Sequence, residues 1–506
     1  MSVKKTLKEK ASEPLLIAAL FEEDPDRCER FNAKALGMHL DFSKQAIDNQ
    51  VWPMLLQWAK ESELMASFEA LYAGDEVNPS EHLPAMHPLM RSCFFSKATH
   101  ADVDWLPFMD ALERFSDPSY RLPSGQPIKD IIHVGIGGSD LGPVFISDAL
   151  KVYQTQPYRL HFVASCDDEV LNRICDACDP ASTMAIVVSK SFSTLETMYN
   201  AKRLKVWFES RLDEKAWSEH SFAVTARPDR AQEWGFSPAS IFSFPIGLGG
   251  RFSSWSAVSL GVAMTLGVEH FTDLMAGAYA MDQHVKHTQV DQNLAVIWAL
   301  TDIWNAHFLN MPTSAMLAYD SRLKYLVNYW QQLSMESLGK SVNFEGETVR
   351  SGSIVWGGEG PGSQHSFHQL LMQGSHRVAL DFIVPVAKTA GTSGSQELLW
   401  ANALAQAEVM MVGDNNRRPE KKIEGNQPSN MLLLPKLNPY YLGALMSLLE
   451  HRVYAQSLLM DVNAFDQWGV ERGKNIASAL LDARSHDLHS STQSLLSIIQ
   501  KMARHS

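Results

Sequence analysis

Cysteine is scarce in this chain, with five residues among 506. A small and odd number of cysteines argues against a fold stapled by disulfides and suits a reducing compartment. Long hydrophobic runs are also missing, because no uninterrupted apolar stretch approaches the roughly 20 residues that a membrane helix needs. The apolar segment at residues 15–20 is too short for the core of a signal peptide and runs straight into acidic residues. These absences lead us to expect a cytoplasmic protein.

Positive charge is in deficit as well, since 44 Lys and Arg residues face 57 Asp and Glu residues and the net charge is −13. We therefore expect neither nucleic acid nor an anionic membrane as a general partner. A local pocket could still bind a small anion, because the Debye length is only about 8 Å at physiological salt. Hydrophobic residues make up 45% of the chain and charged residues 20%, as in ordinary globular proteins. The length allows roughly two to four domains.

Short apolar runs alternate with helical stretches beyond residue 125, and each run suits a strand buried on both faces. The first block of runs spans residues 131–136, 159–164, 184–189 and 221–225, and the second block spans residues 315–319, 353–356, 378–384 and 431–435. Alternation of strand and helix indicates parallel sheets with right-handed crossovers. We expect an α/β protein with two doubly wound domains. The first hundred residues and the C-terminal part from residue 438 are expected to be helical.

Ligands of open parallel sheets bind beyond the carboxyl ends of the strands, so the segments that follow the runs are the first candidates. The first run leads into the glycine-rich segment 135–142, where Ser139 or Asp140 could cap the next helix. The segment lacks the third glycine of a dinucleotide fingerprint and the Gly-Lys-Ser/Thr of a Walker A loop. Taken alone, it is compatible with an anion site and equally with a tight turn.

Hydroxyl side chains crowd the segment that follows the third run. Ser193 and Glu196 have the spacing of a capping box, so a helix is expected to begin there. The same segment contributes Ser189, Lys190, Ser191 and Thr194. A helix N-terminus attracts anions through its unpaired N–H groups and its dipole. Together with the first loop, this segment predicts a site for a phosphate monoester, and simple capping by the hydroxyls is the alternative.

Three further segments hold single candidates for chemistry. Arg251 follows a glycine-rich turn and could stabilise an oxyanion, or form a structural ion pair. Glu336 lies near the end of a helix expected over residues 320–338, where an acid opposes the helix dipole. His365 follows a stretch with four glycines and is expected in the first turn of a helix, where the positive helix end lowers the pKa of the imidazole.

The C-terminal segment places Gln467, Glu471 and Lys474 at the spacing of one helix face, which is also typical of an ordinary solvated face. The pair Cys175 and Cys178 has no second pair at zinc spacing and no histidine cluster after it, so we expect no metal or redox site there.

Seven segments, in order along the chain, resemble the glucose-6-phosphate isomerase (phosphoglucose isomerase) family. They are VGIGGSDLGP (134–143), SKSFSTLET (189–197), GGRFSSWSAVSLG (249–261), QQLSMESLGK (331–340), GSQHSFHQLLMQG (362–374), EGNQPSN (424–430) and FDQWGVERGK (465–474). The resemblance implies two sugar-isomerase (SIS) type α/β domains, a homodimer with the active site at the subunit interface, and no metal or other cofactor. We expect a helical N-terminal extension over residues 1–100, the two α/β domains over 101–285 and 286–460, and a C-terminal helical arm over 461–506.

The resemblance also assigns roles to residues. It implies that Glu336 is the catalytic base, that Arg251 stabilises the enediolate, and that Lys474 assists. It implies that His365 opens the sugar ring and is supplied by the neighbouring subunit. The positions that correspond to the substrate and phosphate contacts of the family are Gly138, Ser139, Ser189, Lys190, Ser191, Thr194, Gln332 and Gln467.

The chain departs from the pattern of the family at four places. Ser191 replaces the usual Thr and keeps the hydroxyl, and Leu338 replaces the usual Asn. An acid commonly precedes the Gly-Gly-Arg turn by three residues, whereas here Gly247 and Leu248 follow Ile246. The segment NPSEHLPAMHP (78–88) lacks the Arg of the corresponding motif near the N-terminus.

We therefore expect an isomerase of glycolysis and gluconeogenesis that interconverts glucose 6-phosphate and fructose 6-phosphate. One alternative is a broader aldose–ketose isomerase that also accepts mannose 6-phosphate. The other is a non-catalytic regulator that binds a sugar phosphate. Such a regulator could discard Glu336, Arg251 and Lys474, whereas this chain retains all three.

Overall fold

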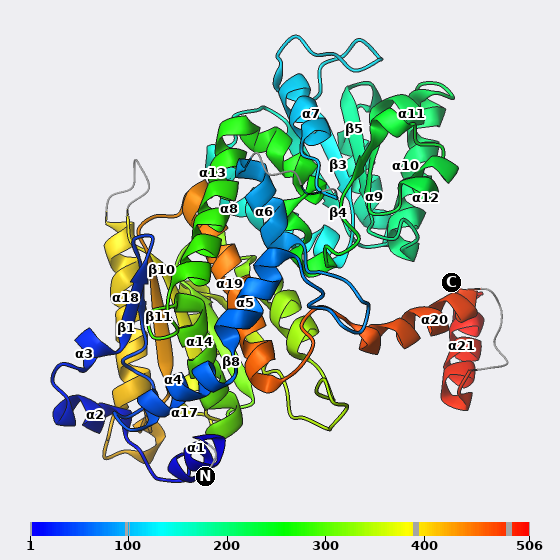
Figure 1. Cartoon of the computed structure of the whole chain (residues 1–506). Helices are drawn as coiled ribbons and strands as arrows, with labels where there is room; N and C mark the ends of the chain where they lie inside the picture. Colours follow the sequence, from blue (N-terminus) through cyan, green and yellow to red (C-terminus); the bar gives the residue numbers. More distant parts are fainter. Residues whose placement is uncertain (1–2, 97–99, 101, 388–393, 482–487, 505–506) are drawn as a thin grey trace. The chain divides into compact units, whose positions relative to one another are not determined.

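The computed structural model describes residues 3–96, 100, 102–387, 394–481 and 488–504 (Figure 1). The chain forms two compact units, Met1–Ala464 and Phe465–Ser506. The first unit contains both β-sheets, and the second contains helices.

The first sheet has five parallel strands in the order β4-β3-β5-β6-β7. The strands are β3 (Asp130–Val134), β4 (Arg159–Val163), β5 (Thr183–Val188), β6 (Ser221–Thr225) and β7 (Ile241–Ser243). The predicted runs at residues 131–136, 159–164, 184–189 and 221–225 all became strands within one or two residues of their expected ends. Strands β3, β5 and β6 are buried at every position, as expected for a sheet covered on both faces.

Helices cover both faces of this sheet, so the domain is doubly wound. On one face, side chains of α9, α10, α11 and α12 pack with Ile132 and Val187 of the strands. On the other face lies the start of α13, where Gly261 approaches Ile131 and Ile186. The helices and short 3-10 turns of this region are η1 (Gly137–Ser139), α8 (Leu141–Ala149), η2 (Lys151–Tyr153), α9 (Asp168–Ala177), η3 (Pro180–Ser182), α10 (Leu195–Arg211), α11 (Ala216–His220), α12 (Pro228–Glu233), η4 (Pro238–Ser240), η5 (Gly250–Trp255), η6 (Ala257–Ser259) and α13 (Leu260–His287).

The second sheet has six strands in the order β1-β2-β11-β10-β8-β9. Four of them run parallel: β8 (Thr313–Ala318), β9 (Ile354–Glu359), β10 (Ala379–Pro385) and β11 (Ser429–Leu434). They correspond to the four runs of the second predicted block. A two-stranded hairpin, β1 (Asn32–Ala35) and β2 (Met38–Asp41), adds antiparallel to β11 at the edge. The expectation that the first hundred residues are helical was wrong for this hairpin.

The second sheet is also covered on both faces. Phe382 and Leu317 pack with side chains of α17 and α18 on one face, and Asp381 meets α14 and α19 on the other. The elements of this region are α14 (Leu294–Ile303), the π-helix η7 (Trp304–Phe308), η8 (Ser321–Leu323), α15 (Leu326–Gln331), the π-helix η9 (Gln332–Glu336), α16 (Gly360–Gln364), α17 (His368–Gln373), α18 (Ser395–Val412), η10 (Pro419–Lys421) and α19 (Pro439–Met460).

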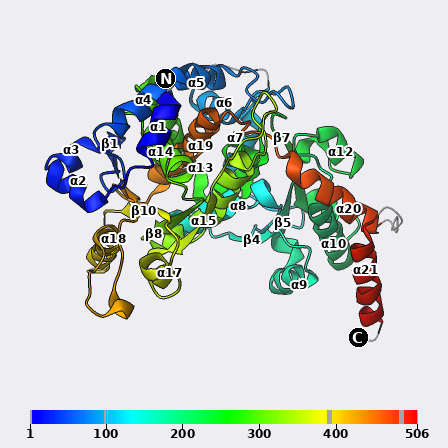
Figure 2. The same cartoon turned by 90° about the horizontal axis from the view of Figure 1, so that it is seen from below.

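Two long helices, α13 and α19, lie side by side in the first unit (Figures 1 and 2). A side chain at Gly277 of α13 would lie 1.7 Å from the carbonyl oxygen of Tyr440. A side chain at Gly443 of α19 would lie 1.9 Å from the carbonyl oxygen of Leu274. These two glycines therefore set the close approach of the helices, which connects the elements of the first sheet with those of the second.

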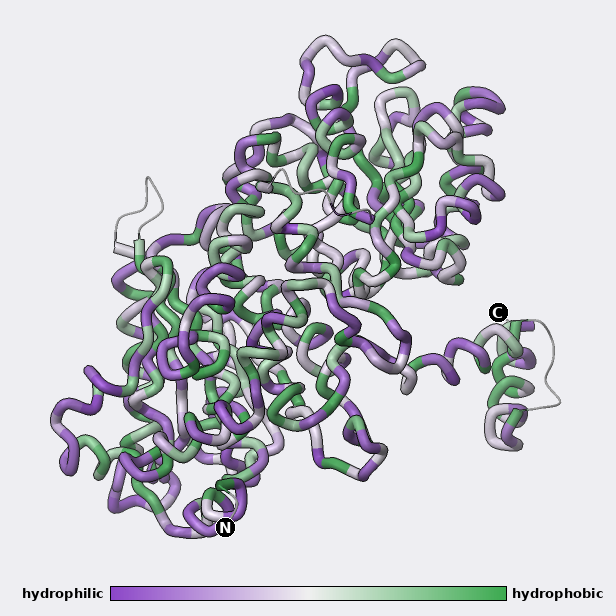
Figure 3. Tube along the Cα trace, viewed as in Figure 1, coloured by the Kyte–Doolittle hydropathy of each residue, from purple (hydrophilic) through white to green (hydrophobic). Residues whose placement is uncertain are grey.

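The N-terminal helices of the first unit are α1 (Val3–Lys10), α2 (Ile17–Glu23), α3 (Arg27–Arg30), α4 (Val51–Glu61), α5 (Leu64–Ala73), α6 (His87–Phe95) and α7 (Leu106–Ser116). The second unit contains η11 (Trp468–Val470), α20 (Glu471–Leu481) and α21 (Ser490–Ala503). Figure 3 shows hydrophilic residues on many of the helices and loops, whereas the strands are mostly hydrophobic or neutral. Within the described ranges, no helix combines the length and the hydropathy needed to cross a membrane.

Candidate active site

The loop after β3 packs directly against the turn that contains Arg251. A Cβ atom at Gly138 would lie 2.0 Å from the carbonyl carbon of Gly250 and 2.6 Å from the backbone nitrogen of Arg251. The Ser253 hydroxyl donates to the carbonyl oxygens of both Gly250 and Gly138, at 2.6 and 3.3 Å. A side chain at position 138 would collide with the turn, so glycine is needed there for these two backbone segments to touch. The segments lie more than a hundred residues apart in the sequence.

A buried histidine in β3 contacts the backbone of the same loop. Nε2 of His133, in β3, lies 2.7 Å from the carbonyl oxygen of Ser139, and burial lowers the pKa of this imidazole to about 4. Asp140 occupies the N-cap position of α8, as predicted, but its side chain makes no capping hydrogen bond. Burial raises the pKa of the Asp140 carboxyl to about 6. His133 was not among the predicted site residues, and its one signal in the sequence is that it is a lone histidine inside an apolar run.

The hydroxyl-rich segment forms a turn between β5 and α10. The hydroxyls of Ser189 and Thr194 are 3.1 Å apart, and the Ser193 hydroxyl donates to that of Ser191 at 2.9 Å. The helix begins one residue later than predicted, because Thr194 is its N-cap and has no side-chain capping bond. The predicted capping box at Ser193 and Glu196 is therefore wrong, and the hydroxyls of this turn bond to one another. A cradle of hydroxyl groups and backbone N–H groups at a helix N-terminus is a setting that suits an anion.

The backbone of this turn is held in an unusual conformation. Phe192 has a φ of 48°, which is rare for a bulky residue, and its side chain is buried. The carbonyl oxygen of Lys190 accepts hydrogen bonds from the Thr225 hydroxyl and from the backbone N–H of Ala226, both at 3.1 Å. Packing and the neighbouring strand thus maintain a backbone strain of a kind that clusters at ligand-binding sites.

Lys190 in the hydroxyl-rich turn lies within the electrostatic influence of Arg251. Burial lowers the pKa of its ammonium group, the charge of Arg251 lowers it further, and Glu81 raises it. Glu81 is held by Asn78, whose amide donates to the carboxylate at 2.7 Å. The sequence analysis noted this segment only as a departure from the family pattern and did not name Glu81.

Arg251 and Glu336 meet at the centre of the site. The guanidinium Nη1 lies 3.6 Å from Oε2 of Glu336. The guanidinium also donates from Nε to the Ser337 hydroxyl at 2.6 Å and from Nη2 to the carbonyl oxygen of Ala464 at 2.5 Å. Arg251 is 3% exposed, whereas the Glu336 side chain is 24% exposed. The carboxylate is thus beside a fixed positive charge and remains reachable from solvent.

Glu336 ends a π-helix and not an ordinary α-helix. The single helix expected over residues 320–338 is divided into η8, α15 and η9. Such π-turns occur frequently at functional sites. At the start of η9, Nε2 of Gln332 lies so near the first loop that a Cβ atom at Gly137 would be 3.2 Å from it. The structure therefore brings Gln332, Glu336, Arg251 and the loop containing Gly138 together.

His365 is exposed and caps the C-terminal end of α16. The expectation that it lies in the first turn of a helix was therefore wrong. Lys474 and Gln467 belong to the second unit. Lys474 donates to Glu471 at 2.7 Å, but Gln467 precedes η11 and does not share the face of α20 as predicted.

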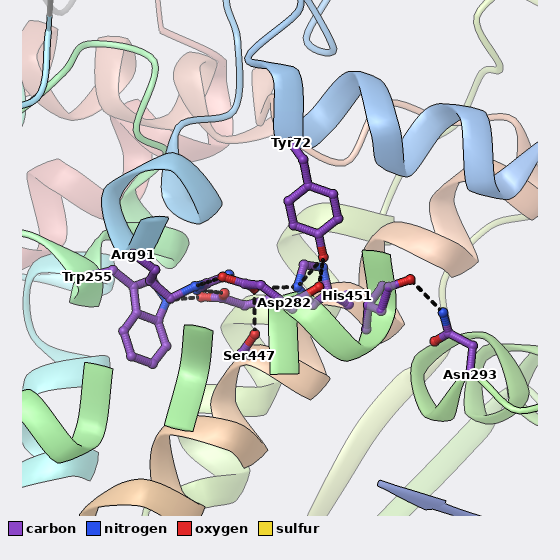
Figure 4. Close-up of polar contacts among 9 residues, drawn as sticks. Tyr72, Arg91, Trp255, Asp282, Asn293, Ser447 and His451 are labelled. Carbon is purple, nitrogen blue, oxygen red and sulfur yellow. Dashed lines mark hydrogen bonds and ion pairs between the residues drawn. The ribbon is translucent and has the colours of Figure 1, made fainter. Parts of the chain in front are cut away.

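A buried polar network supports the turn that contains Arg251 (Figure 4). Trp255, the last residue of η5, donates from Nε1 to Glu450 at 2.6 Å. Arg91 donates to Glu450 at 2.5 Å and to both oxygens of Asp282 at 2.6 and 2.7 Å. His451 and Ser447 also contact Asp282, at 2.7 and 3.0 Å. Breaking a buried pair typically costs about 3–5 kcal/mol, so this network fixes η5 to α6, α13 and α19.

The geometry therefore combines a cradle of hydroxyls with one lysine, a reachable carboxylate and a fixed guanidinium. A carboxylate can take a proton from carbon, and a neighbouring guanidinium can stabilise the negative charge that develops. In the part of the chain that the structure describes, the one group with metal-ligand geometry is Asp130, His161 and Cys178. It lies at the amino-terminal edge of the first sheet and is treated below.

Comparison with known proteins shows what this chain is similar to. The family model described as phosphoglucose isomerase matches residues 41–496. A glucose-6-phosphate isomerase of Acinetobacter venetianus is 38% identical, over 95% of this chain and 93% of the relative. The glucose-6-phosphate isomerase 2 of Chromohalobacter salexigens is 36% identical, over 96% of this chain and 94% of the relative. The crystal structure of a glucose-6-phosphate isomerase from Chlamydia trachomatis has a TM-score of 0.88 at 27% identity and covers 99% of both chains.

Proposed function

This chain belongs to the phosphoglucose isomerase family and interconverts glucose 6-phosphate and fructose 6-phosphate, and we propose that Glu336 is the base of this reaction. The observation that carries the proposal is the pairing of the reachable Glu336 carboxylate with the buried Arg251 guanidinium at 3.6 Å. The reaction is a step of glycolysis and needs one proton to move between neighbouring carbons. A single carboxylate is sufficient for that transfer.

The phosphate group of the substrate is proposed to bind in the turn between β5 and α10. Ser189, Ser191 and Thr194 supply hydroxyl groups, and Lys190 supplies a positive charge. Ser139 and the backbone of Gly138 complete the cradle from the neighbouring loop. Two observations support the proposal: the hydroxyls of Ser189 and Thr194 are 3.1 Å apart within the turn, and the loop and the turn follow the adjacent strands β3 and β5.

The proton transfer is proposed to pass through a cis-enediolate. Glu336 takes the proton from C2 of the open-chain aldose and returns it to C1, so that the C–H bond at C2 breaks and a C–H bond at C1 forms. In the same conversion O1 gains a proton as its carbonyl becomes a hydroxyl, and O2 loses a proton as its hydroxyl becomes the new carbonyl. Arg251 lies beside the carboxylate and stabilises the enediolate oxygen. Gln332 and Gln467 are proposed to contact the substrate.

Ring opening precedes this transfer and is proposed to use His365 and Lys474, which move protons to and from the ring oxygen and its neighbouring hydroxyl. We propose that the protein is a cytoplasmic homodimer and that each active site takes His365 from the neighbouring subunit. The exposure of His365 supports this role, because an imidazole at the surface can reach a site on another subunit.

Glu336→Gln tests the assignment of the base. General acid–base groups contribute typically 10²–10⁴-fold in rate, so we expect kcat to fall at least about a hundredfold in this variant. The assay follows glucose 6-phosphate formed from fructose 6-phosphate with glucose-6-phosphate dehydrogenase. Glu347→Gln, an exposed acid in the loop that follows η9, is the matched control and should retain full activity. Near-normal turnover of Glu336→Gln would show that another group is the base.

A comparison of kcat/KM for mannose 6-phosphate with kcat/KM for glucose 6-phosphate decides whether the enzyme is a broader aldose–ketose isomerase.

A further inference from the structure

Asp130, His161 and Cys178 meet at the amino-terminal edge of the first sheet. Asp130 is the first residue of β3, His161 lies in the neighbouring edge strand β4, and Cys178 is the residue at which α9 ends. The loops of the candidate active site follow the opposite, carboxyl ends of β3 and β5. This cluster is therefore separate from the isomerase site. Sequence spacing could not reveal this cluster, because the partners of Cys178 lie 17 and 48 positions earlier in the chain, on two different strands.

The donor atoms of the three side chains converge on one point. One carboxylate oxygen, one ring nitrogen and the thiol sulfur all lie within 4.8 Å of one another. His161 Nε2 is 2.8 Å from Oδ1 of Asp130 and 3.7 Å from Sγ of Cys178. Both contacts are made by the same ring nitrogen. A catalytic relay would use both ring nitrogens, whereas a shared metal ion needs this convergence.

The separations suit a small metal ion. Zinc binds nitrogen and oxygen at about 2.0–2.2 Å and sulfur at about 2.3 Å in a tetrahedron. Those bond lengths place the donors about 3.3–3.6 Å apart. Opening the pair of His161 and Asp130 by about half an ångström would bring it to that spacing, and the 3.7 Å between Nε2 of His161 and Sγ of Cys178 is already close to it.

A hydrogen bond holds the carboxylate in the orientation that the ion requires. Arg159 donates from Nη2 to Oδ2 of Asp130 at 2.7 Å, which leaves Oδ1 to face His161. Outer contacts of this kind orient metal ligands in many proteins. The Asp130 side chain is 1% exposed and that of His161 is 22% exposed. The carboxylate is thus buried, and the imidazole remains reachable from solvent.

We propose that Asp130, His161 and Cys178 bind one divalent metal ion of the zinc class, with a fourth position open to water. A thiolate and an imidazole favour zinc over magnesium or calcium, which prefer oxygen ligands. The ion would connect β3, the edge strand β4 and the end of α9. Its role is to stabilise this edge of the sheet, and the isomerase reaction does not depend on it.

Cobalt(II) titration of the metal-free, full-length protein tests the proposal directly. A thiolate bound to cobalt gives a charge-transfer band in the near ultraviolet, and we expect this band to saturate at one cobalt ion per chain. Cys178→Ser should abolish the band. Cys166→Ser, which removes an exposed cysteine outside the cluster, is the matched control and should keep it. A band that survives in Cys178→Ser, or that is absent from the folded wild-type protein, would overturn the proposal.

Zinc binding gives a second readout that does not need the thiolate spectrum. We expect zinc to raise the Tm of the wild type and of Cys166→Ser, and to leave the Tm of His161→Gln unchanged. Loss of a residue that only orients a metal ligand typically lowers metal affinity about 10- to 100-fold. His161→Gln removes a ligand itself, so calorimetry should show a loss of zinc affinity at least that large. Unchanged isomerase activity shows that each variant is folded. Equal zinc affinity in the wild type and in His161→Gln would contradict the proposed site.

Discussion

At the residue scale, His133 shows how one buried ring supports the first loop of the site. Its Nε2 lies 2.7 Å from the carbonyl oxygen of Ser139, and burial lowers the pKa of the ring to about 4. The ring is therefore neutral at physiological pH and donates from Nε2. Protonation of the second ring nitrogen would place a charge inside the sheet, where burial opposes it.

This pKa makes a prediction for acid stability. The unfolded chain protonates His133 near pH 6.5, whereas the folded chain does so only near pH 4. The contribution of neutral His133 to the free energy of unfolding is complete above pH 6.5. It is lost as the pH falls towards 4, because the unfolded state binds more protons than the folded state in that window. Each unit of pKa difference corresponds to about 1.4 kcal/mol, so the free energy of unfolding should fall by about 3 kcal/mol across this window.

The measurement compares urea midpoints at about pH 7 and about pH 4.5. We expect the midpoint of His133→Gln to fall less on acidification than that of the wild type. His376→Gln removes an exposed histidine and serves as the control, which should follow the wild type. Parallel curves for the wild type and His133→Gln would contradict the assignment of the acid-sensitive group.

Residue types could be predicted from the sequence, but their partners could not. The family motifs marked Arg251 and Glu336, and the structure places the two side chains 3.6 Å apart. The contacts of Arg251 with Ser337 and Ala464, and its influence on Lys190, join segments that are far apart in the sequence. A single sequence does not show which distant segments lie close together in the fold. For the same reason, the cluster of Asp130, His161 and Cys178 could not be predicted.

At the scale of elements, the buried strands were predicted well because a strand covered on both faces is a continuous apolar run. The hairpin of β1 and β2 was missed because its turn uses Leu36 and Gly37, with φ of 53° and 81°. A leucine in that conformation is not a turn signal, and two strands of four residues are short. The π-helix η9 was missed because its sequence has ordinary helical character.

Gly138→Ala tests the contact between the first loop and η5. The added methyl group would lie 2.0 Å from the Gly250 carbonyl, so the backbones must separate and Arg251 must move with its turn. We expect isomerase activity to fall tenfold or more while the protein stays folded by circular dichroism. Gly358→Ala, whose added methyl would meet only one atom at 3.9 Å, is the control and should retain activity. Full activity of Gly138→Ala would show that this contact does not position Arg251.

At the scale of the whole molecule, the two sheets and the helices between them match the solved isomerase from Chlamydia trachomatis with a TM-score of 0.88. The two-sheet α/β architecture was predictable from the two blocks of apolar runs. The helices of residues 465–506 form a unit of their own. Lys474 and Gln467 both lie in that segment.

Mixed dimers test the proposed sharing of His365 between subunits. Glu336→Gln and His365→Ala subunits are each expected to be inactive alone. In a mixed dimer, one site would combine an intact Glu336 with an intact His365 from the partner. Equal mixing with full exchange yields about half mixed dimers with one good site each, so about a quarter of the wild-type activity should return. No recovery after verified subunit exchange would place His365 and Glu336 of one active site on the same chain.

The transfer of hydrogen in heavy water tests the role of Glu336 most directly. A carboxylate that lifts a proton from carbon exposes it to exchange with solvent, so the wild-type enzyme should introduce deuterium at C2 of glucose 6-phosphate or C1 of fructose 6-phosphate. Nuclear magnetic resonance measures this incorporation, and Glu336→Gln should show neither conversion nor incorporation. Conversion by the wild type with the carbon-bound hydrogen retained in every turnover would contradict the account, because it would indicate a direct hydride shift.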